Sequence, residues 1–205
     1  MLAPSVVFHS NALIVPPLPP DATDKTGVLV NGAIVPEAIS YRGEHTAHGN
    51  PIPQLAETRL AGRWLWGGQL YWHFGHFLTE SASRLWAYAA HGPFDGVIFT
   101  PKRVHAGADM PDWTRAFFTA AGIDQKVTVA TVPTEVESLF IAEQGFGLGH
   151  MSLGSAEFRA FLQNDFARDI EPDGPERLYL SRSEFGPKKG GLLGELVLED
   201  YLATE

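Results

Sequence analysis

Between residues 63 and 142 the sequence alternates short β-prone runs with stretches of helical period, and few architectures satisfy that pattern. The expected strands are Arg63–Trp66, Gln69–Trp72, Gly96–Pro101, Lys126–Ala130 and Val136–Ala142, and the expected helices are Trp72–His91 and Asp112–Ala121. Strands that alternate with helices form a parallel or mostly parallel sheet with helices packed on it. The sequence therefore predicts an α/β fold.

The first 62 residues are β-prone but irregular. Asn31-Gly32 stands between the β-prone triplets Val28–Val30 and Ala33–Val35, which is typical of a two-residue hairpin turn. His45 and His48 follow in a segment with the composition of a loop, without a third metal ligand at a convincing spacing. A β-rich N-terminal segment, 1–62, is therefore expected ahead of the α/β part.

The helix expected over Trp72–His91 has two distinct faces. At about 100° per residue one narrow stripe is polar and a broader arc is apolar. The stripe holds His73, His76, Glu80, Arg84, Ala87 and His91. Imidazoles, a carboxylate and a guanidinium can bind ligands and move protons, although Glu80 and Arg84 also have the spacing of an ordinary stabilising i,i+4 pair.

The order of these residues resembles a known signature. His76-Phe77-Leu78-Thr79-Glu80, with Arg84-Leu85 four residues later, resembles the His-aromatic-Leu-x-Glu/Asp-x-x-x-Arg-Leu signature of glycosyltransferase family 61. That family has Leu-Pro before the arginine, where this chain has Ala82-Ser83. Glu176–Ser183 resembles the family's later strand that ends in Ser-Arg, so two motifs occur in the family's order.

The resemblance implies a two-lobed GT-B-like enzyme. Residues 63–172 would form the first, Rossmann-like lobe with the signature helix, and residues 173–205 the start of a second, nucleotide-sugar lobe. The chain is expected to be cut there, because the helix expected at its end has no Gly cap and the family's later nucleotide-site motif is absent.

A cationic, glycine-rich segment follows the strand expected at Arg177–Ser181. It contains Ser181, Arg182, Lys188 and Lys189 and leads into a helix over 195–205. Backbone N–H groups together with Lys or Arg can bind phosphate oxygens. With the resemblance, this segment is expected to bind the diphosphate of a nucleotide sugar.

Three functions follow as hypotheses. The first is an inverting glycosyltransferase of polysaccharide synthesis, which transfers a sugar from a nucleotide sugar to a saccharide acceptor without metal or cofactor. His76, Glu80 and Arg84 would be its catalytic residues, and the sequence leaves open whether His76 or Glu80 is the base. The second is a non-catalytic or acceptor-binding lobe, and the third is a metal-dependent hydrolase with His73, His76 and Glu80 as ligands.

The composition limits the binding partners and the cellular compartment that we expect. With 44% hydrophobic residues, a chain of 205 residues can bury a core. A net charge of −9 argues against binding to nucleic acid. The chain has no cysteine, which excludes thiol chemistry and fits a reducing compartment, and no run of about 18 apolar residues. We expect a cytoplasmic protein, with peripheral association to a membrane-bound assembly left open.

Overall fold

The computed structural model describes residues 3–17, 25–102, 110–123, 126–171, 173–185 and 191–204. Residues 1–170 form one compact unit and residues 171–205 form a second, smaller unit. The boundary falls in the segment 169–175, whose acidic, Pro- and Gly-containing composition is typical of a linker. Lys188 and Lys189 lie outside the described residues.

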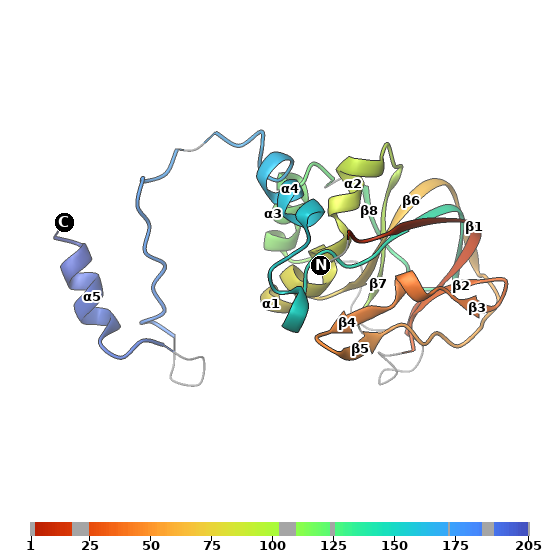
Figure 1. Ribbon diagram of the computed structural model, residues 1–205, viewed down its shortest axis with the longest axis horizontal. Helices are drawn as coiled ribbons and strands as arrows, with labels where there is room; N and C mark the ends of the chain where they lie inside the picture. The colour runs from red at the N-terminus through yellow and green to blue at the C-terminus, as the bar shows by residue number, and fades with distance from the viewer. Residues whose placement is uncertain are drawn as a thin grey trace. The chain divides into compact units, whose positions relative to one another are not determined.

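The first unit is built on a seven-stranded sheet with the order β3-β2-β1-β9-β6-β7-β8 (Figure 1). Its strands are β1 (Val6–Val15), β2 (Gly27–Val30), β3 (Ala33–Ile34), β6 (Thr58–Leu70), β7 (Gly96–Pro101), β8 (Val127–Val129) and β9 (Thr134–Ala142). β6 pairs in parallel with both β7 and β9, and β7 with β8, whereas β1 pairs antiparallel with β9 and β2. The α/β class and the mostly parallel sheet are confirmed, and the arrangement is compatible with a Rossmann-like fold.

Helices cover one face of this sheet (Figure 1). They are α1 (Phe74–His76), α2 (Trp86–His91), α3 (Asp112–Ala120) and α4 (Ala156–Asn164). Their core contains Leu65, Val97 and Phe99 from the strands, whereas the next residues along, Trp66 and Ile98, belong to a second core. That alternation is the period of two expected of strands buried on both faces. None of the helices among the described residues is long and apolar enough to cross a membrane.

The N-terminal segment joins the main sheet. The hairpin predicted at Asn31-Gly32 is confirmed, with φ of 50° and 78° at the two residues. Val28, Val35 and Ala38, which lie in or beside β2, β3 and the 3₁₀ turn Pro36–Ala38, pack in the second core. The segment therefore covers the sheet face that the helices leave open.

The prediction of a loop around His45 and His48 is wrong. Residues His45–His48 form β5, which pairs antiparallel with β4 (Ser40–Arg42) in a separate two-stranded sheet. His45 and Thr46 are exposed, whereas His48 at the other end of the strand is only 1% exposed. Composition misleads here because tertiary burial decides the state of a short polar strand.

β6 is one continuous strand, although the sequence predicts two, Arg63–Trp66 and Gln69–Trp72. The register against β7 shifts between Trp66 and Gly68, so Gly67 and Gly68 form a bulge instead of a break. A Cβ on Gly67 would lie 2.3 Å from Cε1 of Phe99, and Gly68 has a φ of +90°. Glycine is needed here for close packing and for left-handed backbone.

The segment 74–91 is helical but is not one α-helix. After α1 the chain widens into a π-helical turn, Phe77–Ser81, in which the N–H of Ala82 donates to the carbonyl of Phe77. A 3₁₀ turn, Ala82–Arg84, then tightens it before α2 begins. Each change shifts the rotation per residue away from 100°, so the predicted polar stripe is not a single surface.

The second unit has one helix, α5 (Glu195–Leu202), within its described residues, as the sequence predicts. The strand predicted at Arg177–Ser181 is wrong, because residues 177–181 have no strand pairing. Leu178 and Leu180 are 72% and 79% exposed. A β-prone run becomes a strand only when another strand pairs with it.

Candidate functional site

The candidate site lies where the parallel strands β6 and β7 end. Tyr71 and Lys102 directly follow these two strands, and the Lys102 Nζ lies 4.3 Å from the centre of the Tyr71 ring. Open α/β sheets place ligands outside the carboxyl ends of their strands. Ser81 fixes the helical segment here: it accepts a hydrogen bond from the Tyr71 N–H and donates one to the Gln69 carbonyl, both at 2.9 Å.

Three polar side chains meet at this edge. His76 Nδ1 lies 2.6 Å from Oε1 of Glu80, and Arg42 Nη2 lies 3.0 Å from each Glu80 carboxylate oxygen. Arg42 Nε donates to the same carboxylate at 3.2 Å. Glu80 is only 2% exposed, whereas Arg42 and His76 are 38% and 36% exposed. A buried carboxylate thus holds an imidazole at the surface.

The electrostatics fit a stable ion pair. The hydrogen bond that Arg42 donates to Glu80 raises the pKa of Arg42, against the opposing effect of burial. Burial, followed by the nearby Glu80 charge, raises the pKa of Tyr71, so its hydroxyl stays protonated. The Arg42 guanidinium lies 6.0 Å from the centre of the Tyr71 ring, so that ring is close to two cations, Arg42 and Lys102.

Sequence reasoning missed Arg42. It lies 38 residues before Glu80 and ends a strand of only three residues, Ser40–Arg42. The only available signal was a basic residue next to an aromatic one in a short β-prone triplet, and that signal is common in any sequence. The predicted members His76 and Glu80, in contrast, are brought together.

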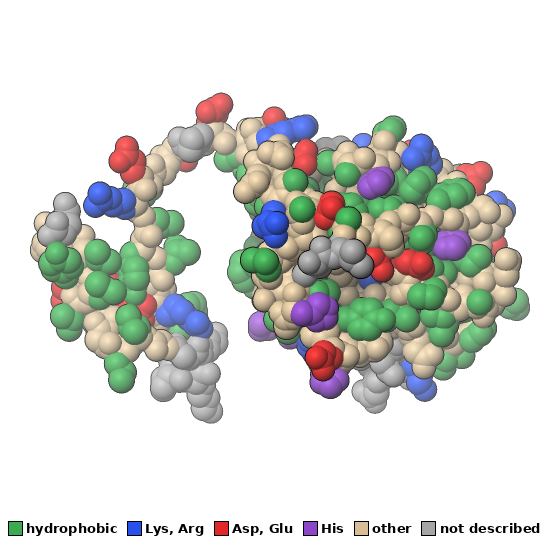
Figure 2. Space-filling model, in the orientation of Figure 1, with side chains coloured by type: hydrophobic (Ala, Val, Ile, Leu, Met, Phe, Trp, Pro, Cys, Tyr) green, Lys and Arg blue, Asp and Glu red, His purple; other side chains and the backbone are tan. Residues whose placement is uncertain are grey.

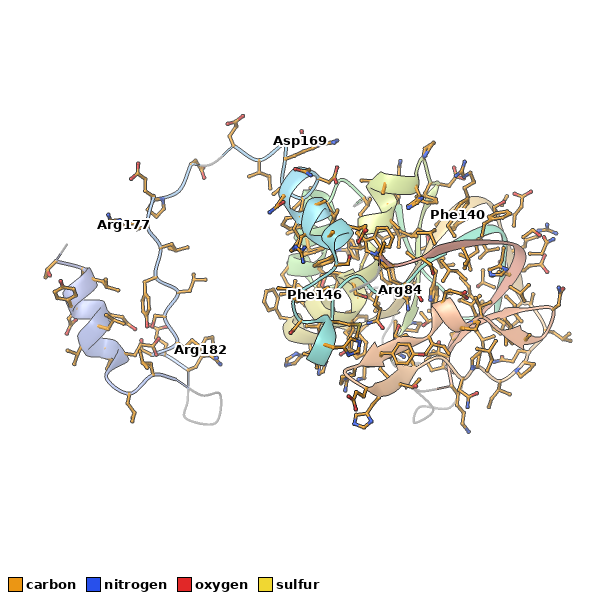
Figure 3. The ribbon with its side chains drawn as sticks, viewed as in Figure 1. Arg84, Phe140, Phe146, Asp169, Arg177 and Arg182 are labelled. Carbon is orange, nitrogen blue, oxygen red and sulfur yellow. The ribbon has the colours of Figure 1, made fainter. Side chains whose placement is uncertain are left out.

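Arg84 lies in the interior of the first unit (Figure 3). It is fully buried, and its guanidinium donates to backbone carbonyls of Glu37 at 2.8 Å, Ile39 at 2.7 Å and Ala142. Burial lowers the pKa of Arg84 to about 10, which leaves it charged at neutral pH. The geometry makes Arg84 a clamp between the 37–40 segment and the end of β9.

The Glu80–Arg84 pair suggested by their spacing does not form. Glu80 pairs with Arg42 and His76 instead. The π-helical and 3₁₀ turns rotate the two side chains away from each other, so that Glu80 faces the site and Arg84 faces the core.

His48 lies close to Arg84 and makes stability depend on pH. Burial, and then the positive charge of Arg84, lowers the pKa of His48 to about 3 from an ordinary value of 6.5. Between those values the unfolded chain binds a proton that the folded chain does not. Stability is therefore retained above pH 6.5 and lost as the pH falls; from pH 7 to 5 we expect a loss of about 2 kcal/mol from this residue.

Urea unfolding at pH 7 and pH 5 measures this effect. His48→Gln should reduce the difference in unfolding free energy between the two pH values by about 2 kcal/mol. His45→Gln, on the exposed end of the same strand, is the matched control and should leave that difference unchanged. An equal pH dependence in all three proteins would contradict the assignment to His48.

The metal-ligand set proposed for a hydrolase is not assembled. Within the ranges that the structure describes, no three His, Asp or Glu side chains are grouped so as to hold a metal ion. His73 is exposed with its ring 5.2 Å from that of His76, while His76 Nδ1 contacts Glu80.

In the second unit, Ser181 and Arg182 contact α5. The Arg182 N–H donates to Oε1 of Glu195 at 3.0 Å, and the Ser181 hydroxyl donates to Glu199. The Arg182 N–H also contributes most to lowering the pKa of Glu195. Two residues predicted to bind phosphate thus bind carboxylate oxygens of the same chain, Ser181 through its hydroxyl and Arg182 through its backbone N–H.

Comparison with known proteins adds no relative to this picture. No protein-family model, curated protein or solved structure matches the chain.

Proposed function

We propose that the protein is an inverting glycosyltransferase, similar to family 61, which transfers a sugar from a nucleotide sugar to a saccharide acceptor. The observation that carries the proposal is the 2.6 Å contact between His76 Nδ1 and Glu80 Oε1, at the carboxyl ends of the parallel strands. A base oriented by a second group is the arrangement used to activate a hydroxyl nucleophile. Both residues belong to the motif that suggested the family.

In this mechanism His76 is the base. Its Nδ1 is held by Glu80, so Nε2 is the nitrogen that accepts the proton of the acceptor hydroxyl as the oxygen attacks the anomeric carbon. The new bond forms on the face opposite the leaving group, the bond to the nucleoside diphosphate breaks, and the electron pair leaves with the phosphate oxygen. Glu80 stabilises the imidazolium that forms.

Glu80 is better suited to orient than to accept the proton. It is 2% exposed and its two oxygens are engaged by Arg42 and His76. Protonating it would remove the charge that Arg42 binds, and would break an ion pair whose carboxylate is buried. Arg42 is thus the positioning residue behind Glu80, and Arg84 supports the fold around the site.

The donor side is proposed on the resemblance alone. Ser181, Arg182, Lys188 and Lys189 would bind the diphosphate as part of a GT-B-like nucleotide lobe, where cations can stabilise the developing negative charge. Phosphates that bind the Ser181 hydroxyl or the Arg182 backbone N–H would have to replace Glu199 or Glu195 there. We propose a cytoplasmic reaction that needs no cofactor or metal.

The direct test is release of nucleoside diphosphate. The protein, incubated with a panel of nucleotide sugars and saccharide acceptors in the presence of a chelator, should release nucleoside diphosphate only when donor and acceptor are both present. Arg42→Gln should lower the rate by about 10- to 100-fold, since it frees Glu80, whereas Arg42→Lys should retain part of it. Full turnover in Arg42→Gln would contradict its role.

A non-catalytic, acceptor-binding lobe is the second candidate. It is favoured by the described part of the second unit, where Leu178 and Leu180 are exposed and 177–181 forms no strand. Hydrogen exchange decides between the acceptor-binding lobe and the transferase. Fast exchange across residues 178–202 both with and without nucleotide favours the acceptor-binding lobe, and nucleotide-dependent protection favours the transferase.

A further inference from the structure

The first unit contains a cavity of about 360 Å³ that the His76 site does not use. Its walls come from the N-terminus, from the 36–41 segment and from the chain after β9. They are formed by Ala3, Pro4, Pro36, Glu37, Ile39, Tyr41, Glu143, Gln144, His150 and Met151. This volume is at the lower end of the range of small-molecule sites, about 300–1,000 Å³.

The cavity is held open by contacts between its walls. Arg84 donates to the Glu37 and Ile39 carbonyls on one wall and to the Ala142 carbonyl at the base of the other. The Gln144 amide both accepts from the Tyr41 N–H and donates to the Tyr41 carbonyl. A site whose walls are tied together by buried donors loses little entropy when a ligand binds.

The lining has a defined chemistry. Two carboxylates, Glu37 and Glu143, can only accept hydrogen bonds, and Oε2 of Glu143 already accepts one from the Ser5 N–H at 2.8 Å. His150 and the Tyr41 hydroxyl can both donate and accept. Ile39 and Met151 add apolar surface. The described residues of the lining include no lysine or arginine, so the cavity attracts donors and cations and repels anions. Figure 2 shows acidic side chains and histidines gathered near β4 on this face.

We propose that this cavity binds one sugar unit that is uncharged or carries an ammonium group, and that it excludes uronic acids and other anionic sugars. Sugar hydroxyls would donate to the two carboxylates, and the exposed Tyr41 ring offers a flat apolar face to the sugar ring. The proposal rests on the proposed function, because it adds a subsite for a saccharide acceptor. Tyr41 lines the cavity and its neighbour Arg42 holds Glu80, so one short strand, β4, connects the two sites.

Related sugars that differ in charge test the proposal without a nucleotide donor. Methyl glycosides of a neutral sugar, its 2-amino form and its uronic acid are titrated into the protein by calorimetry, in the gluco, galacto and manno series. NMR signals of the His150 ring report whether binding occurs at the cavity. The best amino sugar should bind at least about tenfold more tightly than its uronic acid, with the neutral sugar between them.

Variants then test whether the preference for amino sugars over uronic acids comes from the two carboxylates. Glu37→Gln with Glu143→Gln should reduce that ratio to about threefold or less, and Glu44→Gln, in the turn between β4 and β5, should leave it unchanged. A preference for uronic acids, or no shift of the His150 signals with any sugar of the panel, would overturn the inference. Sugar binding at the cavity in a protein that never releases nucleoside diphosphate would instead refute only the transferase proposal, and turnover without such binding would refute only the cavity.

Discussion

Replacing His76 with alanine should lower the rate of nucleoside diphosphate release by about 100- to 10,000-fold, the usual contribution of a positioned general base. Because His76 is 36% exposed, the fold should tolerate the change. Circular dichroism and the urea midpoint should therefore match those of the unchanged protein. The measurement is the steady-state rate over a range of acceptor concentrations.

Comparison with a second histidine isolates this role. His91→Ala alters an exposed histidine at the end of α2, on the same helical segment, and should leave the rate unchanged. Glu80→Gln should lower the rate less than His76→Ala does, because a base remains but its orienting charge is lost. A rate that falls in Glu80→Gln but not in His76→Ala would assign the base to Glu80.

Arg84→Met should destabilise the first unit by about 3–5 kcal/mol, the typical cost of breaking a buried charged network. Methionine keeps much of the side-chain length but leaves the carbonyls of Glu37, Ile39 and Ala142 without their donors. Urea unfolding followed by tryptophan fluorescence measures the loss.

Two further variants define the result. Arg115→Ala, on the exposed side of α3, should change stability by less than about 0.5 kcal/mol. Arg84→Lys keeps the charge but not the planar fork, so its loss should be smaller than that of Arg84→Met. If Arg84→Met does not fold, Arg84→Lys still provides the test, and a change of less than about 1 kcal/mol in that variant would contradict the clamp.

Local signals were sufficient for much of the fold. The Asn31-Gly32 hairpin and the strands β7 to β9 follow from residues close together in the sequence. The same reasoning failed at 177–181, where a β-prone run has no partner strand among the described residues. It also failed at 45–48, where polar residues form β5 against β4.

Only the part of the candidate site that is formed by residues close together in the sequence could be predicted. His76 and Glu80 are four residues apart on one helical segment, so their contact follows from spacing. Arg42 reaches them through the tertiary fold, and no spacing rule connects residues from separate strands and helices. Arg84 falls on the polar stripe only at a constant 100° per residue, and this segment changes helix type twice.

The widened turn at Phe77–Ser81 can be regarded as a one-residue insertion in an α-helix. Deleting Thr79 would restore an ordinary α-helical turn. It would also rotate the helical residues before position 79 by about 100° relative to those after it. The shortened helix would be more regular, yet its histidine and its buried arginine could no longer both reach their partners. Irregularity is what lets two motif residues on one short segment serve solvent and interior at once, and a designer who idealised this helix would lose one of them.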